Sequence, residues 1–212
     1  MGKRKGASGV APGVAAFLSI LALITLWVTG WFSRLPRDLG LSSGNELLGW
    51  LLAASVSSVV EITVSPTVTL HVGVLWLFFA FLRLMREVPS SSRLSVGTAL
   101  LFFGFAFFIA GELSEFDPAW VLFPLQRFCL AFLIGLTLLV APRLDLRLSI
   151  LTGGMLTGII LSSLSPLSST GGIRIGSAVH WDMLWISMIA LTALHHVLSW
   201  AERKLFRFRA KL

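Results

Sequence analysis

Cysteine, tyrosine and charged residues are scarce in this chain. Cys129 is the single cysteine among 212 residues, so no disulfide can form within the chain. Tyrosine is absent, although there are eight tryptophans. Charged residues make up only 13% of the chain and hydrophobic residues 56%, with a mean hydropathy of +0.87. A chain this apolar cannot hide its surface inside one soluble core, which predicts a membrane protein.

Several motifs that carry enzyme chemistry are also missing. The sequence has no phosphate-cradling glycine loop, no C-x-x-C pair and no H-E-x-x-H. These absences exclude P-loop ATP hydrolysis and zinc-peptidase chemistry. His195 and His196 are adjacent, so on a helix they point about 100° apart and cannot both face one ligand. We therefore expect no cofactor and no metal. His71 and His180 are the one pair of histidines that the predicted helix arrangement could bring together.

The net charge of +7 does not indicate nucleic-acid binding. The basic residues lie in short connections and at both ends of the chain, and no basic face is interleaved with aromatic residues. The positive-inside effect and anionic lipid headgroups account for this distribution. We expect membrane lipids as partners and no nucleic acid.

Long hydrophobic runs predict the fold. Continuous apolar runs close to twenty residues indicate membrane-spanning helices, whereas a barrel would show short alternating stretches. Seven apolar segments are present: 11–32, 46–64, 70–85, 97–111, 119–141, 148–164 and 178–200. The sequence therefore predicts an all-α bundle of six or seven spans, forming a single integral membrane domain over residues 1–212 without a soluble domain. Similar stretches open the second, fourth and sixth segments: RDLGLSS, SRLSVGT and LRLSILT. This similarity suggests one N-terminal helix followed by three helical hairpins.

The distribution of arginine predicts the orientation. Basic residues fill alternate connections and the C-terminal tail, which the positive-inside rule assigns to the cytoplasm of a bacterial inner membrane. They are Arg34, Arg37, Arg83, Arg86, Arg93, Arg143, Arg147, Arg203, Lys204, Arg207, Arg209 and Lys211. Seven crossings would leave the basic residues 3–5 outside. We slightly prefer six crossings with both termini inside, with one of the first two segments re-entrant or interfacial.

Ionisable residues collect at the predicted outer ends of the helices. Charges at the edge of a span are costly, so these positions are the first to consider for function. They are Glu61, His71, Glu112, Glu115, Asp117, His180 and Asp182. Convergence of His71, His180, Asp182, Glu61 and Glu112 would provide groups for acid-base catalysis on a lipid-linked or peptide substrate. The alternative is that each side chain simply meets water at the interface.

Arg127 and a pair of glycines suggest two other roles. If its helix begins at Ala119, Arg127 lies about 12 Å deep and would bind an anionic substrate. If the helix begins near Leu125, Arg127 reaches the headgroups instead. Gly154 and Gly158 form a small-xxx-small pattern, which predicts close helix packing within the bundle or against a partner.

One stretch of the sequence partly resembles a known family, but the resemblance is too incomplete to assign the chain to that family. His71, the Arg83 and Arg86 turn and the GELSEF stretch follow the order of features in the VanZ-like family. The Asp-Lys that this family places before the histidine is Thr67 and Val68 here, and Glu-Leu-Ser-Glu replaces its Glu-x-x-Gln. No residue role is carried over.

The leading functional hypothesis is a non-enzymatic membrane subunit, either permease-like or a scaffold, that works with a protein partner or as a homo-oligomer. An intramembrane enzyme with an outer-face histidine and carboxylate site is the first alternative. A small secondary transporter that binds an anion at Arg127 is the second.

Overall fold

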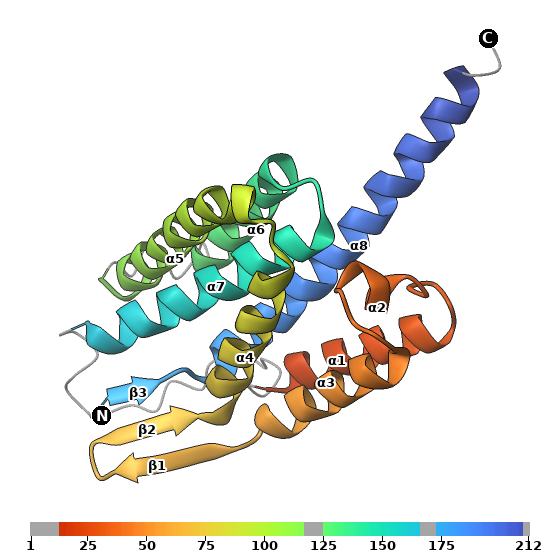
Figure 1. The fold of residues 1–212 in the computed structure, drawn as a ribbon. Helices are drawn as coiled ribbons and strands as arrows, with labels where there is room; N and C mark the ends of the chain where they lie inside the picture. Colours follow the sequence, from red (N-terminus) through yellow and green to blue (C-terminus); the bar gives the residue numbers. More distant parts are fainter. Residues whose placement is uncertain (1–12, 117–124, 166–172, 210–212) are drawn as a thin grey trace.

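The computed structural model describes residues 13–116, 125–165 and 173–209, which form eight α-helices, one short 3-10 helix and a three-stranded sheet (Figure 1). The helices are α1 (Val14–Val28), α2 (Leu35–Asp38), α3 (Gly44–Ser57), α4 (Val72–Glu87), η1 (Ser90–Ser92), α5 (Arg93–Phe116), α6 (Leu125–Val140), α7 (Leu144–Leu164) and α8 (Ala178–Arg209). The strands are β1 (Glu61–Ser65), β2 (Val68–His71) and β3 (Ile173–Ile175).

Local side-chain chemistry fixes where helices begin. At the start of α3, the Ser43 hydroxyl accepts a hydrogen bond from the Glu46 N–H, and the Glu46 carboxylate reaches back to the N–H and hydroxyl of Ser42. This reciprocal pattern satisfies backbone donors that a helix start leaves unpaired. Pro89 and Pro142 lie just after α4 and just before α7, where a helix cannot continue through a proline.

All helices except the short α2 run between two ends of the bundle (Figure 1). We call one the sheet end, because β1, β2 and β3 lie there beside the starts of α4 and α8. We call the other the basic end, where Arg83 lies near the end of α4 and Arg147 lies in the first turn of α7. Consecutive long helices within the described residues run in alternate directions (Figure 1).

The small sheet is a departure from the all-α prediction. β1 and β2 form an antiparallel hairpin that places Glu61 opposite His71, and β3 adds to β2 in parallel. The predicted segment 46–64 is therefore not one continuous helix, because α3 ends at Ser57 and β1 follows. The stretch around β1 is rich in valine, isoleucine and threonine, whose branched side chains favour strands over helices.

Three helices are long and apolar enough to cross a membrane: Ser90–Leu113, Leu144–Leu164 and Ala178–Glu202. Two shorter apolar helices, Val14–Val28 and Arg127–Val140, also occur in the described part. A helix of 14 residues such as α3 is about 21 Å long, which is less than the roughly 30 Å hydrocarbon core. The structure thus confirms a mostly helical protein with membrane-length helices, but not the number of six or seven spans.

α5 and α7 pack closely against each other through glycines. A Cβ added to Gly104 of α5 would lie 2.9 Å from the Gly154 carbonyl oxygen of α7, and one added to Gly154 would lie 2.5 Å from the Phe103 ring. Gly158 approaches Phe107 in the same way. Gly154 and Gly158 therefore face α5 of the same chain, where the absence of side chains lets the two backbones approach closely.

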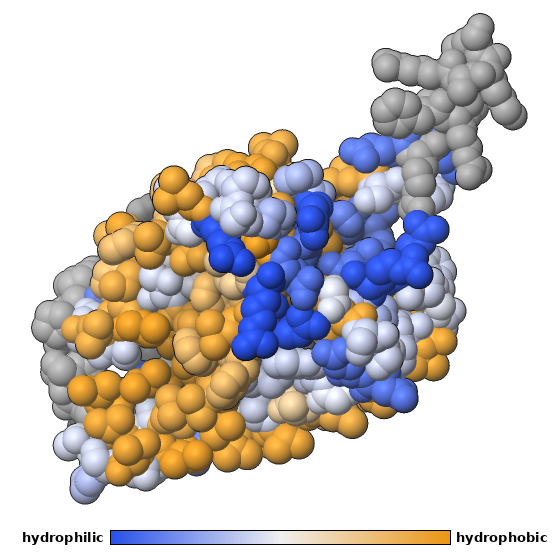
Figure 2. All heavy atoms as spheres, in the orientation of Figure 1, coloured by the Kyte–Doolittle hydropathy of each residue, from blue (hydrophilic) through white to orange (hydrophobic). Residues whose placement is uncertain are grey.

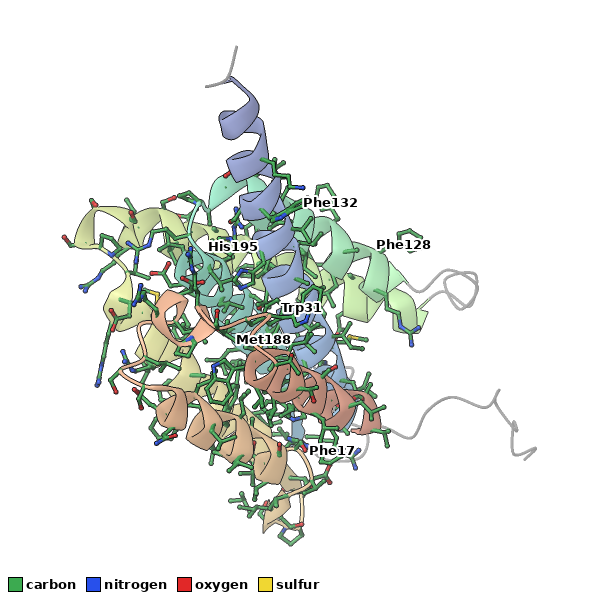
Figure 3. The ribbon with its side chains drawn as sticks, turned by 90° about the vertical axis from the view of Figure 1, so that its right-hand side faces the viewer. Phe17, Trp31, Phe128, Phe132, Met188 and His195 are labelled. Carbon is green, nitrogen blue, oxygen red and sulfur yellow. The ribbon has the colours of Figure 1, made fainter. Side chains whose placement is uncertain are left out.

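The outer surface of the bundle is mostly apolar. Figure 2 shows hydrophobic side chains over α5 and the β1–β2 hairpin, and a hydrophilic patch over α2 and the end of α4. Phe17 of α1 and Phe128 and Phe132 of α6 project outward (Figure 3), each at least half exposed. Such a surface suits contact with lipid chains.

Candidate functional site

His71 lies at the junction between β2 and α4. Its side chain is only 3% exposed, and its Nδ1 accepts a hydrogen bond of 3.2 Å from the Gly73 N–H, so the imidazole caps the first turn of α4. Glu61 is its cross-strand neighbour, but the Glu61 side chain is exposed. The β1–β2 hairpin thus sets one buried histidine beside one solvent-accessible carboxylate at the sheet end.

His180 lies in the first turn of α8 and contacts the residue that precedes this helix. The Ser177 hydroxyl is 2.7 Å from Nδ1 of His180 and also accepts a hydrogen bond from the His180 N–H. Ser177 therefore caps the start of α8 while its hydroxyl is bonded to an imidazole. A serine hydroxyl that donates to a histidine nitrogen is the pairing that activates serine nucleophiles.

A small cavity joins these histidines. His71, Ser177, His180 and Trp181 all line it, together with apolar side chains from α4, α7 and α8. Its volume is about 10 Å³, which is room for about one water molecule. The structure therefore brings His71 and His180 to one cavity, in the arrangement that the topology suggested, but the cavity is too narrow for a substrate.

Asp182 does not contribute to this cavity. Its two carboxylate oxygens accept hydrogen bonds of 2.8 Å from the Gly13 N–H and 2.6 Å from the Ala16 N–H. α1 has no capping side chain of its own, since Gly13 occupies the N-cap position. Asp182 supplies the cap from α8 instead, and its negative charge complements the positive end of the α1 dipole.

The remaining predicted acidic residues are dispersed. Glu112, near the end of α5, accepts a hydrogen bond of 3.0 Å from the Ser165 hydroxyl at the end of α7. The side chain of Glu115 and the whole of Asp117 lie outside the described residues. Within the described residues, no group of three or more histidine, cysteine, aspartate or glutamate side chains is placed to hold a metal ion.

Arg127 lies in the first turn of α6, which begins at Leu125, and its side chain is exposed. This position agrees with the alternative in which the helix begins near Leu125 and the Arg127 guanidinium reaches the lipid headgroups. No described pocket includes Arg127 in its wall.

The basic end holds a buried polar cluster that the sequence did not single out. Arg147 is only 7% exposed, although its position in a basic connection indicates a solvated loop residue. Its guanidinium donates to the carbonyl oxygens of Ala141 at 2.6 Å and Leu138 at 3.0 Å, and to Nδ1 of His195 at 2.6 Å. An arginine has no acceptor, so Nδ1 of His195 must accept and the His195 ring must carry its proton on Nε2.

The signal for this cluster was present in the sequence in part. His195 stands two helical turns before the basic tail within an apolar helix, and Arg147 lies in the first turn of a helix, two residues after Asp145. Asp145 is also buried and pairs with Arg143, whose Nη2 lies 2.6 Å from a carboxylate oxygen. Arg143 and Arg147 thus have different partners although they are close in the sequence. Their spacing alone does not predict which of the two is buried.

Comparison with known proteins agrees with the membrane assignment. Residues 46–210, which run from α3 past the end of α8, match the family described as YphA-like integral membrane protein. The chain belongs to this family. No curated protein and no solved structure matches the chain. Membership of the YphA-like family establishes an integral membrane protein, in agreement with the apolar helices above.

Proposed function

We propose that the chain is a non-enzymatic, multi-pass membrane subunit that receives a transmembrane helix of another chain between α5 and α6. One observation carries this proposal. A groove of about 610 Å³ lies between these helices and is lined by side chains of both.

The composition of the groove suits a helix as its occupant. Ser91, Ser95 and Ala99 lie four residues apart, so η1 and α5 present a stripe of small side chains along one wall. Thr98 and Thr137 add hydroxyls to the lining. Small residues let helix backbones approach closely in lipid, and hydroxyls form hydrogen bonds between helices.

Two further glycines of α5 and α6, outside the lining of the groove, have open space around them. A Cβ added to Gly97 of α5 or Gly135 of α6 would meet no atom within 4 Å. This contrasts with the glycines of the α5–α7 contact, where an added Cβ would overlap a neighbour. The groove side of α5 therefore carries small residues, as does the side that packs against α7. Within the described part of the chain, no helix occupies the groove.

Photo-crosslinking tests this proposal. A photoreactive amino acid at Thr98, inside the groove, should give a discrete adduct with one protein in native membranes, joined through an apolar helical peptide. The same amino acid at Leu52, an exposed position on α3, should give only lipid adducts. An adduct of twice the chain's mass would identify a second copy as the occupant.

A matched pair of substitutions serves as the control. Ala99→Phe fills the groove and should remove the adduct, whereas Ala53→Phe makes the same change at an exposed position of α3 and should not. Lipid adducts alone at Thr98, or a protein adduct that survives Ala99→Phe, would overturn the proposal.

The orientation is part of the same proposal. Seven passes between the ends, with the basic end in the cytoplasm of a bacterial inner membrane, put the C-terminus inside and the start of α1 outside. This differs from the preferred six-crossing prediction, and it is supported by the hydrogen bonds from Gly13 and Ala16 to Asp182 at the sheet end. Single cysteines at positions 67 and 90 in a Cys129→Ala background should be labelled by an impermeant reagent at 67 only.

An enzyme at the sheet end is the second candidate, supported by the 2.7 Å contact between Ser177 and His180. In this alternative, His180 acts as the base and His71 shares its cavity, whereas Glu61, Glu112 and Asp182 do not line that cavity. A fluorophosphonate probe should label the purified protein, and both Ser177→Ala and His180→Ala should abolish labelling. Absence of labelling in the unsubstituted protein would remove this candidate.

Anion transport through Arg127 is the third candidate, and the exposed position of this arginine in α6 offers it the least support. Its test is uptake of inorganic phosphate into proteoliposomes. Loss of uptake with Arg127→Gln and recovery with Arg127→Lys would support it, and equal uptake by all three proteins would exclude it.

A further inference from the structure

The imidazole of His71 is a helix cap that functions only while it is uncharged. The His71 side chain is buried, and its Nδ1 accepts a hydrogen bond of 3.2 Å from the Gly73 N–H at the start of α4. A ring nitrogen that accepts a hydrogen bond carries no proton, whereas both nitrogens of a charged imidazole are donors. Protonation of Nδ1 would therefore set a donor against the Gly73 N–H and remove the cap.

Close packing holds the His71 ring in this orientation. A Cβ added to Gly73 would lie 2.8 Å from Nδ1 of His71 and 2.8 Å from the Trp181 ring, so the Gly73 backbone packs tightly against both side chains. A Cβ added to Gly176 would lie 3.4 Å from Cβ of His71. A charged His71 ring could reach a new acceptor only by displacing these neighbours.

The small cavity beside His71 offers little solvent to a charged ring. It has room for about one water molecule, and burial without solvent disfavours the charged form of an imidazole. His180 lines the same cavity, and a charge on one imidazole disfavours a charge on the other. Ser177 and His180 are only half-buried, so the cavity approaches the surface on their side.

The charged side chains of the neighbouring elements do not replace that solvent. Glu61 of β1 lies opposite His71, but its side chain is exposed, and water weakens its attraction for a charge on the ring. Asp182 of α8 is bonded to the start of α1, and Glu112 of α5 is bonded to the end of α7. Arg174 of β3 is exposed. Among the described residues, the groups around His71 therefore favour its neutral form.

We propose that His71 is an acid-sensitive switch at the sheet end of the protein. Its neutral ring caps α4, and acidification protonates the ring, releases the Gly73 N–H and loosens the first turn of α4 beside the cavity. Histidine ordinarily titrates near about pH 6.5, and burial favours the neutral form, so the cap is present above this pH and is lost as the pH falls below it.

Hydrogen exchange at the Gly73 amide tests this proposal. The full-length protein in detergent is compared at about pH 7.5 and about pH 5, on either side of the ordinary histidine titration, with exchange expressed relative to the intrinsic rate at each pH. Protection of Gly73 should fall by about fivefold at the lower pH, which is the factor that loss of a typical helix cap represents. Protection at Gly154, in the α5–α7 contact, should not change. Equal protection of Gly73 at the two pH values would overturn the proposal.

Two matched substitutions separate the switch from a merely structural role. His71→Asn keeps an acceptor oxygen at the cap position but cannot be protonated, so Gly73 should stay protected at both pH values. His196→Asn makes the same change at a histidine that stacks on Phe32, away from the sheet end, and should keep the full response of the unsubstituted protein. A response that persists in His71→Asn, or one that His196→Asn removes, would also overturn the proposal.

Discussion

The guanidinium of Arg147 lies 2.6 Å from Nδ1 of His195, and this contact joins the start of α7 to α8 inside the basic end. The same guanidinium caps the end of α6 through the carbonyl oxygens of Leu138 and Ala141. Three helices are thus fastened by one buried cation, which accounts for the presence of an arginine where the helices are otherwise apolar.

Removal of this arginine should destabilise the bundle. Arg147→Met leaves two carbonyl oxygens and an imidazole nitrogen without their donor, and we expect a loss of about 2–3 kcal/mol in the free energy of unfolding. Arg86→Met removes an exposed arginine from the last turn of α4 and should change stability by less than about 0.5 kcal/mol. Thermal unfolding in detergent measures both, and equal melting temperatures for the two variants would contradict the structural role of Arg147.

The acceptor on His195 can be tested separately. An asparagine side-chain oxygen can occupy nearly the same position as Nδ1, so His195→Asn should retain most of the stability. His195→Leu has no acceptor and should lose about 1–2 kcal/mol. The order of the two melting temperatures decides the prediction. A leucine variant at least as stable as the asparagine variant would mean that the contact with Arg147 contributes no net stability.

Asp182 should behave as a helix cap. Asp182→Ala removes both acceptors for the first turn of α1 and should cost about 1–2 kcal/mol, while Asp182→Asn keeps one acceptor oxygen and should cost less. Hydrogen exchange at the Ala16 amide should accelerate in the alanine variant, with little change in α5. Unchanged exchange at Ala16 would show that the cap does not form, and the catalytic hypothesis for Asp182 would regain ground.

The two classes of glycine on α5 and α7 should respond in opposite ways. Gly154→Ala brings a methyl group against the Phe103 ring and should destabilise the protein by about 1–3 kcal/mol. Gly97→Ala adds the same methyl group in open space within a helix and should be neutral or stabilising by up to about 1 kcal/mol. Thermal unfolding of the two single variants tests the contrast, and a Gly154→Ala variant as stable as Gly97→Ala would rule out tight α5–α7 packing.

The sequence alone determined the class of the protein. Apolar runs near twenty residues leave a helical membrane protein as the only arrangement that satisfies every backbone amide in lipid, and the family match agrees with this. The order of apolar segments and basic connections also predicted that His71 and His180 lie at the same end of the bundle. Each of them stands near the start of an apolar segment, on the side opposite the arginines. These conclusions depend on local hydropathy and charge, which a sequence displays directly.

Tertiary structure decided which polar residues are paired, and with what. Asp182, predicted beside the histidines, points instead to the start of α1, and Arg147, predicted in a loop, is buried against His195. Likewise, the strand at Glu61–Ser65 ends a segment whose hydropathy alone indicated a continuous span. In each case, the outcome depends on a donor or acceptor that is distant along the chain, and hydropathy carries no information about which distant group will be in hydrogen-bonding range.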